Sequence, residues 1–304
     1  MKRRIALKRP VMSRKITFKL LLTSFLAFTL TNIFAQSGKA VYTFPLGLQT
    51  YTYRNMMPKD VVGTLDLIKS LGFKEIESGT PKGMTAEEYK KLLDERGIKV
   101  TSTGAGYEQI VKDPEAVVKQ AKALGASFVM VAWIPHQKSN FSLENAKKAV
   151  EDFNRVGKVL KDNGLTFCYH NHGYEFQPTS EVKDKDGTLF DYMVQNTNPN
   201  YVSFEMDILW ATHGGADCVK LLNKYGSRWK LMHLKDLKKG IKGDLSGGTP
   251  PENDVVLGDG QIDMPGVLKA AKKVGIKHYY IEDESNHEDT QVPASIAYLK
   301  NLKE

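Results

Sequence analysis

The chain has 304 residues, with 43 Lys and Arg against 35 Asp and Glu, which gives a formal net charge of +8. Eight basic residues and no acidic residue fall within residues 1–35, so the remaining 269 residues carry equal numbers of each charge. A nucleic-acid partner, which needs a basic surface, is therefore not expected. A mature length of 269 residues suits a single (β/α)8 barrel, which typically needs about 250.

The N-terminal segment has the pattern of an export signal. A basic region precedes an apolar run over residues 20–30, and Ala35 offers a small residue for cleavage before Gln36. The apolar run is too short for a comfortable membrane span. We therefore expect a signal peptide over residues 1–35, a periplasmic or secreted mature domain over residues 36–304, and no stable membrane insertion after cleavage. An uncleaved N-terminal anchor is the alternative.

Two cysteines remain in the mature chain. Cys168 falls in a predicted strand and Cys218 in a predicted helix. They could pair in an oxidising compartment, but two buried free thiols are favoured, because two cysteines make no disulfide framework.

A repeated unit begins near residue 46: a short apolar strand, a polar loop, an amphipathic helix and a glycine. Glycine adopts the left-handed conformation that ends a helix at little cost, so each such glycine predicts a corner between a helix and the next strand. Thr85 and Glu88 predict a capping box, and Pro114 predicts the first residue of a helix. The corner glycines are Gly72, Gly97, Gly125, Gly164 and Gly275.

Eight strands alternate with helices in this pattern, which predicts an α/β fold with a parallel sheet closed into a TIM barrel. An open doubly wound sheet is the alternative, but residues 54–58, after the first strand, lack the expected glycine-rich phosphate loop. The long irregular stretch over residues 238–263 is expected to lie over the mouth of the barrel. The predicted strands are residues 46–53, 74–78, 100–103, 128–133, 166–172, 202–210, 231–235 and 279–282.

The last four predicted strands each end in a side chain that can bind a metal: His170, Asp207, His233 and Glu282. Side chains alternate along a strand, so these polar groups share the face that points into the barrel. Unpaired polar groups there are costly, and one divalent cation resolves that cost. A single strand histidine is more often a hydrogen-bonded core residue, but their joint placement favours a metal site.

Other polar and aromatic residues fall near the predicted mouth and are candidate substrate contacts. Each has an ordinary alternative, such as a solvated loop position, an ion pair or simple packing. They are Glu77, Trp133, His136, Glu175 and His213.

With these residues placed, the mature chain resembles the xylose isomerase-like barrel superfamily, whose members are often called sugar phosphate isomerases/epimerases. The most specific stretches are Y-H-N-H-G-Y-E-F (169–176), M-D-I-L-W-A-T-H-G-G (206–215), H-L-K-D (233–236) and G-D-G-Q-I-D-M-P-G-V-L (258–268). The resemblance implies one Mn, Co, Zn or Mg ion held by His170, Asp207, His233 and Glu282.

One departure from the family pattern matters. The first ligand is normally Glu, and here it is His170. In epimerases of the family that the chain resembles, that Glu is one of two bases that face each other across the substrate. The resemblance therefore implies that two-base epimerisation is disfavoured here. The ligand set also loses one negative charge and becomes richer in nitrogen, which favours transition metals over Mg.

The chemistry expected of such a site is removal of a proton next to a sugar carbonyl. Glu282 or His172 is expected to handle that proton, while Lys235 stabilises oxygen or returns a proton. The export signal and the missing Glu favour a lyase that cleaves 3-keto-glycosides by β-elimination, with a small-molecule carbohydrate as its substrate. A sugar isomerase or epimerase and a non-catalytic sugar-binding barrel remain as alternatives. A repair-endonuclease relative is disfavoured by the balanced charge.

Overall fold

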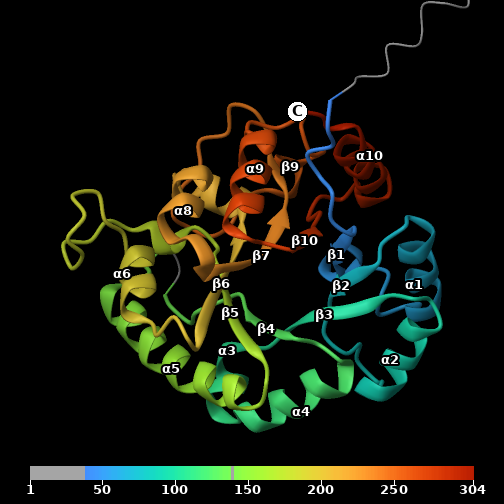
Figure 1. Ribbon diagram of the computed structural model, residues 1–304, viewed down its shortest axis with the longest axis horizontal. Coiled ribbons are helices and arrows are strands. Elements are labelled where there is room, and N and C mark those ends of the chain that lie inside the picture. Colours follow the sequence, from blue (N-terminus) through green and yellow to red (C-terminus); the bar gives the residue numbers. More distant parts are fainter. Residues whose placement is uncertain (1–37, 138–139) are drawn as a thin grey trace, which may run out of the picture. The chain divides into compact units, whose positions relative to one another are not determined.

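The computed structural model describes residues 38–137 and 140–304, and the predicted signal peptide lies outside the described residues. Residues 40–302 form one compact unit. In it, parallel strands close into a barrel in the order β1-β10-β7-β6-β5-β4-β3-β2 (Figure 1). The predicted (β/α)8 barrel is therefore confirmed. The barrel strands are β1 Gly47–Gln49, β2 Glu75–Glu77, β3 Lys99–Gly104, β4 Phe128–Val131, β5 Thr166–His170, β6 Val202–Asp207, β7 Trp229–Leu234 and β10 His278–Ile281.

Helices surround the barrel on its outside (Figure 1). The predicted capping box at Thr85 and Glu88 begins α2, and Pro114 is the first residue of α4, as expected. All the predicted corner glycines have positive φ. The helices are α1 Val61–Ser70, α2 Ala86–Asp94, α3 Tyr107–Lys112, α4 Pro114–Leu124, α5 Leu143–Asp162, α6 Leu189–Asn196, α7 Ile208–His213, α8 Cys218–Tyr225, α9 Met264–Val274 and α10 Glu288–Asn301.

Several predicted strands end earlier than expected, and two of them end where a polar side chain caps a helical turn. The strand predicted over residues 202–210 ends at Asp207, because the side chain of Asp207 accepts the backbone N–H of Trp210 and starts α7. The strand predicted over residues 46–53 ends at Gln49, whose side chain accepts the N–H of Tyr51 and starts a 3-10 turn. In both places a polar side chain caps a helical turn that an apolar pattern alone does not reveal.

The long loop after β7 folds over the carboxyl ends of the strands. It contains a small antiparallel pair, β8 Asp236–Leu237 and β9 Asp254–Val255. A side chain at Gly247 would lie 2.8 Å from the Tyr174 ring and 3.4 Å from the Trp133 ring. The loop therefore contacts the segments that follow β4 and β5, as the sequence predicts.

Cys168 and Cys218 are both buried free thiols. Within residues 38–137 and 140–304, no helix is long and apolar enough to cross a membrane.

Gly47→Ala is expected to destabilise the barrel by about 1–3 kcal/mol. An added Cβ would lie 2.3 Å from the Tyr279 carbonyl oxygen and 2.9 Å from the Tyr280 ring, and β10 is held against β1 by their ladder. Gly79→Ala is the control, because a Cβ there meets no atom within 4 Å. Urea unfolding measures both variants, and equal midpoints for Gly47→Ala and the wild type would contradict this expectation.

Candidate active site and metal centre

The carboxyl ends of β5, β6 and β7 bring three of the four predicted metal ligands together. Asp207 and His233 are register partners on β6 and β7. One ligand atom from each of His170, Asp207 and His233 lies within 4.8 Å of the others, and all three side chains are buried. His170 Nε2 and His233 Nδ1 are each 3.8 Å from Asp207 Oδ2.

The two carboxylate oxygens of Asp207 have different surroundings. Oδ1 accepts the Trp210 N–H at 2.8 Å, and the Asn171 side chain bonds both the N–H and the C=O of Asp207. Oδ2 is buried without a hydrogen-bond partner among the described residues. An oxygen without a donor, facing two imidazole nitrogens, fits a bound divalent cation.

Glu282 completes the predicted set just beyond β10. Its Oε2 lies 3.0 Å from His233 Nδ1 and 3.2 Å from the Lys235 ammonium. Lys235 is almost fully buried, lies 3.8 Å from Asp207 Oδ2 and also bonds Glu284. The structure therefore brings His170, Asp207, His233, Glu282 and Lys235 into one cluster.

The charges of this cluster follow from burial and from its carboxylates. Burial opposes the charged form of His233, but Glu205 and Glu282 outweigh burial and raise the His233 pKa well above its usual value. Burial likewise opposes a charged Lys235, yet Glu282 and Glu284 raise the Lys235 pKa. Against its own burial, Lys235 and then His233 lower the Glu282 pKa.

At the other two ligands, His170 and Asp207, burial is the effect that sets the direction of the pKa shift. It lowers the pKa of His170 well below the usual value, with His233 adding to the effect. Burial raises the pKa of Asp207 to about 6, although Lys235 opposes that rise. At neutral pH the cluster therefore holds a neutral His170, a charged Lys235 and an ionised Glu282.

Two further carboxylates, Glu77 and Glu205, lie beneath the ligands inside the barrel and have no exposed surface. Glu205 Oε2 is 3.2 Å from His170 Nδ1, and Glu77 Oε1 is 2.9 Å from His233 Nε2. Glu77, a predicted substrate contact, is thus bonded to a predicted ligand. Burial and the nearby Glu77 raise the pKa of Glu205 to about 8.

A cavity of about 310 Å³ opens onto the ligands. Because its lining includes both predicted ligand histidines and His172, a substrate entering it would meet the candidate metal centre directly. His172 is half-buried and neutral, since desolvation and the nearby Lys235 lower its pKa to about 4. The lining residues are Gln49, Tyr51, Met130, Ala132, His170, His172, His233, Glu282 and Glu284.

Aromatic residues beside this cavity come from the segments after β4, β5 and β6. Trp133 is 43% exposed and stacks on His136, and its edge contacts His172. The His172 ring stacks on Trp210 at a centroid distance of 5.5 Å. These groups form an aromatic wall at the mouth, consistent with the predicted location of Trp133 and His136.

The other two predicted substrate contacts, Glu175 and His213, form hydrogen bonds with neighbouring segments of the chain. Glu175 is fully buried, accepts the His172 N–H at 2.9 Å and bonds the Tyr169 hydroxyl. Burial raises the Glu175 pKa to about 7. His213 is buried, and its Nδ1 accepts the Asp244 N–H at 3.4 Å. Neither Glu175 nor His213 lines the 310 Å³ cavity.

The sequence analysis gives no role to several residues of this region. Period-two alternation puts Glu205 on the inward face with Asp207 and Glu284 with Glu282, but alternation alone does not show what either carboxylate bonds. Gln49 and Tyr51 carry no such signal, because their place depends on where β1 ends.

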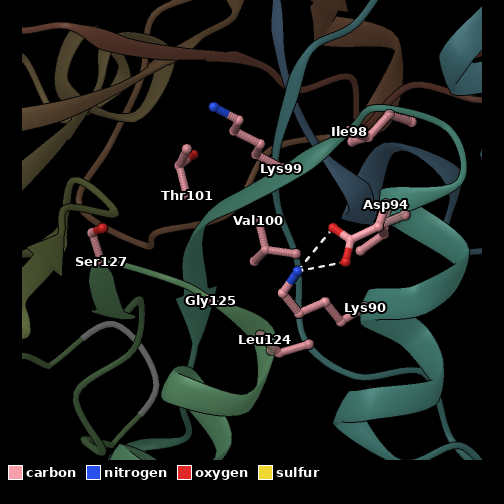
Figure 2. A pocket seen from close by; sticks show the side chains of 10 residues that line it. Lys90, Asp94, Ile98, Lys99, Val100, Thr101, Leu124, Gly125 and Ser127 are labelled. Atoms are coloured by element: carbon pink, nitrogen blue, oxygen red, sulfur yellow. Dashed lines mark hydrogen bonds and ion pairs between the residues drawn. The ribbon is translucent and has the colours of Figure 1, made fainter.

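A second cavity, of about 320 Å³, lies among residues that precede β3 and β4 or begin β3, and hence at the opposite end of the barrel (Figure 2). Its most prominent polar contact is the ion pair between Lys90 and Asp94. Catalytic groups in TIM barrels lie at the carboxyl ends of strands, so this cavity is not the candidate active site.

The model of the family described as "Xylose isomerase-like TIM barrel" matches residues 65–302. Among curated proteins, the inosose dehydratase of Clostridium beijerinckii is 26% identical over 244 residues, which cover 71% of this chain and 76% of that protein. The inosose dehydratase of Klebsiella pneumoniae is 27% identical over 238 residues, 69% of this chain and 77% of the other.

Solved structures show the same architecture. A sugar phosphate isomerase/epimerase from Parabacteroides distasonis is 25% identical, with a TM-score of 0.68 over 84% of this chain and 96% of the other. An IolI protein crystallised with a zinc atom shares the fold at 16% identity, with a TM-score of 0.65 over 84% and 95%. Since the family model covers most of the sequence, the chain belongs to the xylose isomerase-like TIM barrel family.

Proposed function

We propose that the chain is a divalent-metal-dependent lyase that cleaves 3-keto-glycosides by β-elimination. The chain is a carbohydrate enzyme of the lyase or isomerase type, in line with its relatives. The observation that supports a bound metal is the buried Asp207 Oδ2 atom, which has no hydrogen-bond donor among the described residues and faces His170 and His233. Two nitrogens and two carboxylates suit Mn, Co or Zn better than Mg.

His170, Asp207, His233 and Glu282 would hold the ion. When bound, it would polarise the C3 carbonyl and stabilise the negative charge that develops on its oxygen. The surrounding side chains exclude water and position the sugar, with the aromatic wall at the mouth available to contact the apolar face of the ring.

His172 is the proton acceptor in this proposal. It lines the cavity, its Nδ1 has no partner within the described residues, and its lowered pKa keeps the ring neutral. Glu282 is less suited, because it is already bonded to His233 and Lys235. Transfer of the C2 proton to His172 leaves the C–H electron pair to form a C1=C2 double bond as the C1–O bond breaks.

Lys235 supplies the proton for the departing oxygen. Its raised pKa keeps it an ammonium at neutral pH, and it bonds Glu282 and Glu284, which both line the cavity. The departing alkoxide takes that proton and leaves as the alcohol. The relatives named inosose dehydratase, which by that name remove water, support elimination over epimerisation.

Metal uptake is expected to strengthen with pH. The raised His233 pKa means that the metal-free protein holds a proton on the nitrogen facing the ion, and binding must expel that proton. Below the His233 pKa, the apparent affinity should rise about tenfold per pH unit for each proton released. Titration calorimetry in buffers of different ionisation enthalpy measures the release, and a pH-independent affinity would contradict it.

Incubation with an aryl 3-keto-glucoside tests the reaction. Protein loaded with Mn or Co should release the aglycone, and protein treated with a chelator should not. Turnover of a free ketose without aglycone release would instead assign an isomerase. Metal binding with no exchange of any substrate proton in heavy water would assign a sugar-binding barrel.

We also propose export to the periplasm or beyond, supported by the basic and apolar segments of residues 1–35. Mass spectrometry of the protein recovered from its native cell envelope should find an N-terminus at Gln36. An intact Met1 in that fraction would overturn cleavage.

A further inference from the structure

The carboxylates of Glu77 and Glu205 have no role in the reaction proposed above. Both are fully buried, and neither lines the 310 Å³ cavity. A buried carboxylate is costly unless it meets strong donors. The imidazoles of His170 and His233 are among their donors, so these acids bond the candidate ligands on the side away from the ion.

Each of the two imidazole rings directs one nitrogen towards a buried carboxylate and the other towards the candidate metal position. His170 directs Nδ1 to Glu205 Oε2 at 3.2 Å and Nε2 towards Asp207 Oδ2 at 3.8 Å. His233 directs Nε2 to Glu77 Oε1 at 2.9 Å and Nδ1 to Glu282 Oε2 at 3.0 Å. A neutral imidazole carries one proton and binds a metal through its other nitrogen.

We propose that Glu205 and Glu77 are positioning residues that keep the ring protons on His170 Nδ1 and His233 Nε2, so that His170 Nε2 and His233 Nδ1 face the ion. This inference rests on the metal site of the proposed function. Acceptors of this kind orient a ligand histidine and increase its basicity.

Both acids are held in place by the fold. Glu205 is the register partner of His170, on the neighbouring strand. Glu77 accepts hydrogen bonds from the Gln49 side chain and the Ser102 hydroxyl, each at 2.5 Å. Glu205 therefore lies directly behind His170, the ligand that replaces the usual carboxylate of the family.

The first test uses the metal-free protein. Long-range proton–nitrogen NMR in alkaline buffer should show His170 protonated on Nδ1 in the wild type. In Glu205→Gln, the amide can turn to donate to Nδ1, so the tautomer protonated on Nε2 should become populated. An unchanged tautomer in a folded Glu205→Gln variant would overturn the proposal for Glu205, whatever the reaction proves to be.

The second test measures Zn²⁺ affinity by calorimetry. Glu205→Gln and Glu77→Gln should each weaken binding about 10–100-fold. Glu75→Gln is the matched control, because Glu75 also bonds a histidine, His278 Nδ1 at 2.9 Å, but lies away from the ligands. Its affinity should stay within about twofold of the wild type, and an equal loss in all three variants would indicate a general structural effect.

A double variant separates positioning from simple charge. In a His170→Glu background the Nδ1 proton of residue 170 is gone, and Glu205 keeps only its 3.3 Å contact from Oε1 to His233 Nε2, so Glu205→Gln should weaken the affinity clearly less than it does in the wild-type background. An equal weakening in both backgrounds would overturn the proposal. Should Glu205→Gln fail to fold, Glu77→Gln and the His233 tautomer give the same test. A wild type that binds Zn²⁺ but cleaves no keto-glycoside would refute only the reaction.

Discussion

Asp207→Asn is expected to remove divalent-metal binding and activity while the barrel stays folded. The amide oxygen can still accept the Trp210 N–H as Oδ1 does, so the start of α7 is kept. The charge on Oδ2, which faces both imidazoles, is lost. We expect the metal affinity to fall about a hundredfold or more. Loss of a residue that only orients a ligand already lowers the affinity about 10–100-fold, and Asp207 is itself a ligand.

Metal content after dialysis and thermal melting of the metal-free protein check this expectation. The metal-free variant should melt no lower than the metal-free wild type at neutral pH, because burial outweighs the attraction of Lys235 and raises the Asp207 pKa to about 6, so the ionised carboxylate is a net cost to folding. Asp207→Ala is the comparison, since it also removes the helix cap and should cost about a further 1 kcal/mol. Full metal retention in Asp207→Asn would refute the assignment of Oδ2 to the ion.

Lys235→Met should have the converse pattern, with a large loss of turnover and no loss of metal. Its ammonium lies 3.2 Å from Glu282 Oε2 and 3.8 Å from Asp207 Oδ2, so in the metal-free protein it competes with an ion for both carboxylates. Removing it should leave the metal affinity equal or higher. The rate of aglycone release should fall about 10²–10⁴-fold, which is typical for the loss of a general acid.

The leaving group offers an internal control for Lys235. An aglycone of low pKa departs without help from an acid, so Lys235→Met should lose far less with a nitrophenyl glycoside than with an alkyl glycoside. Equal losses on both substrates would assign Lys235 to binding or orientation. A loss of metal in this variant would contradict the competition inferred from the two distances.

The sequence alone predicted the barrel because each repeat carries local signals. Glycines such as Gly72 and Gly125 end helices by a local backbone preference, and both have positive φ in the structure. The placement of His170, Asp207 and His233 together was also predictable, because parallel strands end at one rim and alternate side chains face inward. The alternation of side chains along each strand and the closure of the barrel are together enough to bring these three side chains close to one another.

What the sequence could not determine is which polar group bonds which. The end of β6 depends on whether Asp207 caps a helix or continues a strand, and an apolar pattern fits both. Glu77 reads as a residue at the mouth, but pairing between distant strands places it beneath His233, 156 positions away in the sequence. The contact between Glu205 and His170 depends on strand register, which long-range packing sets and no short stretch of sequence encodes.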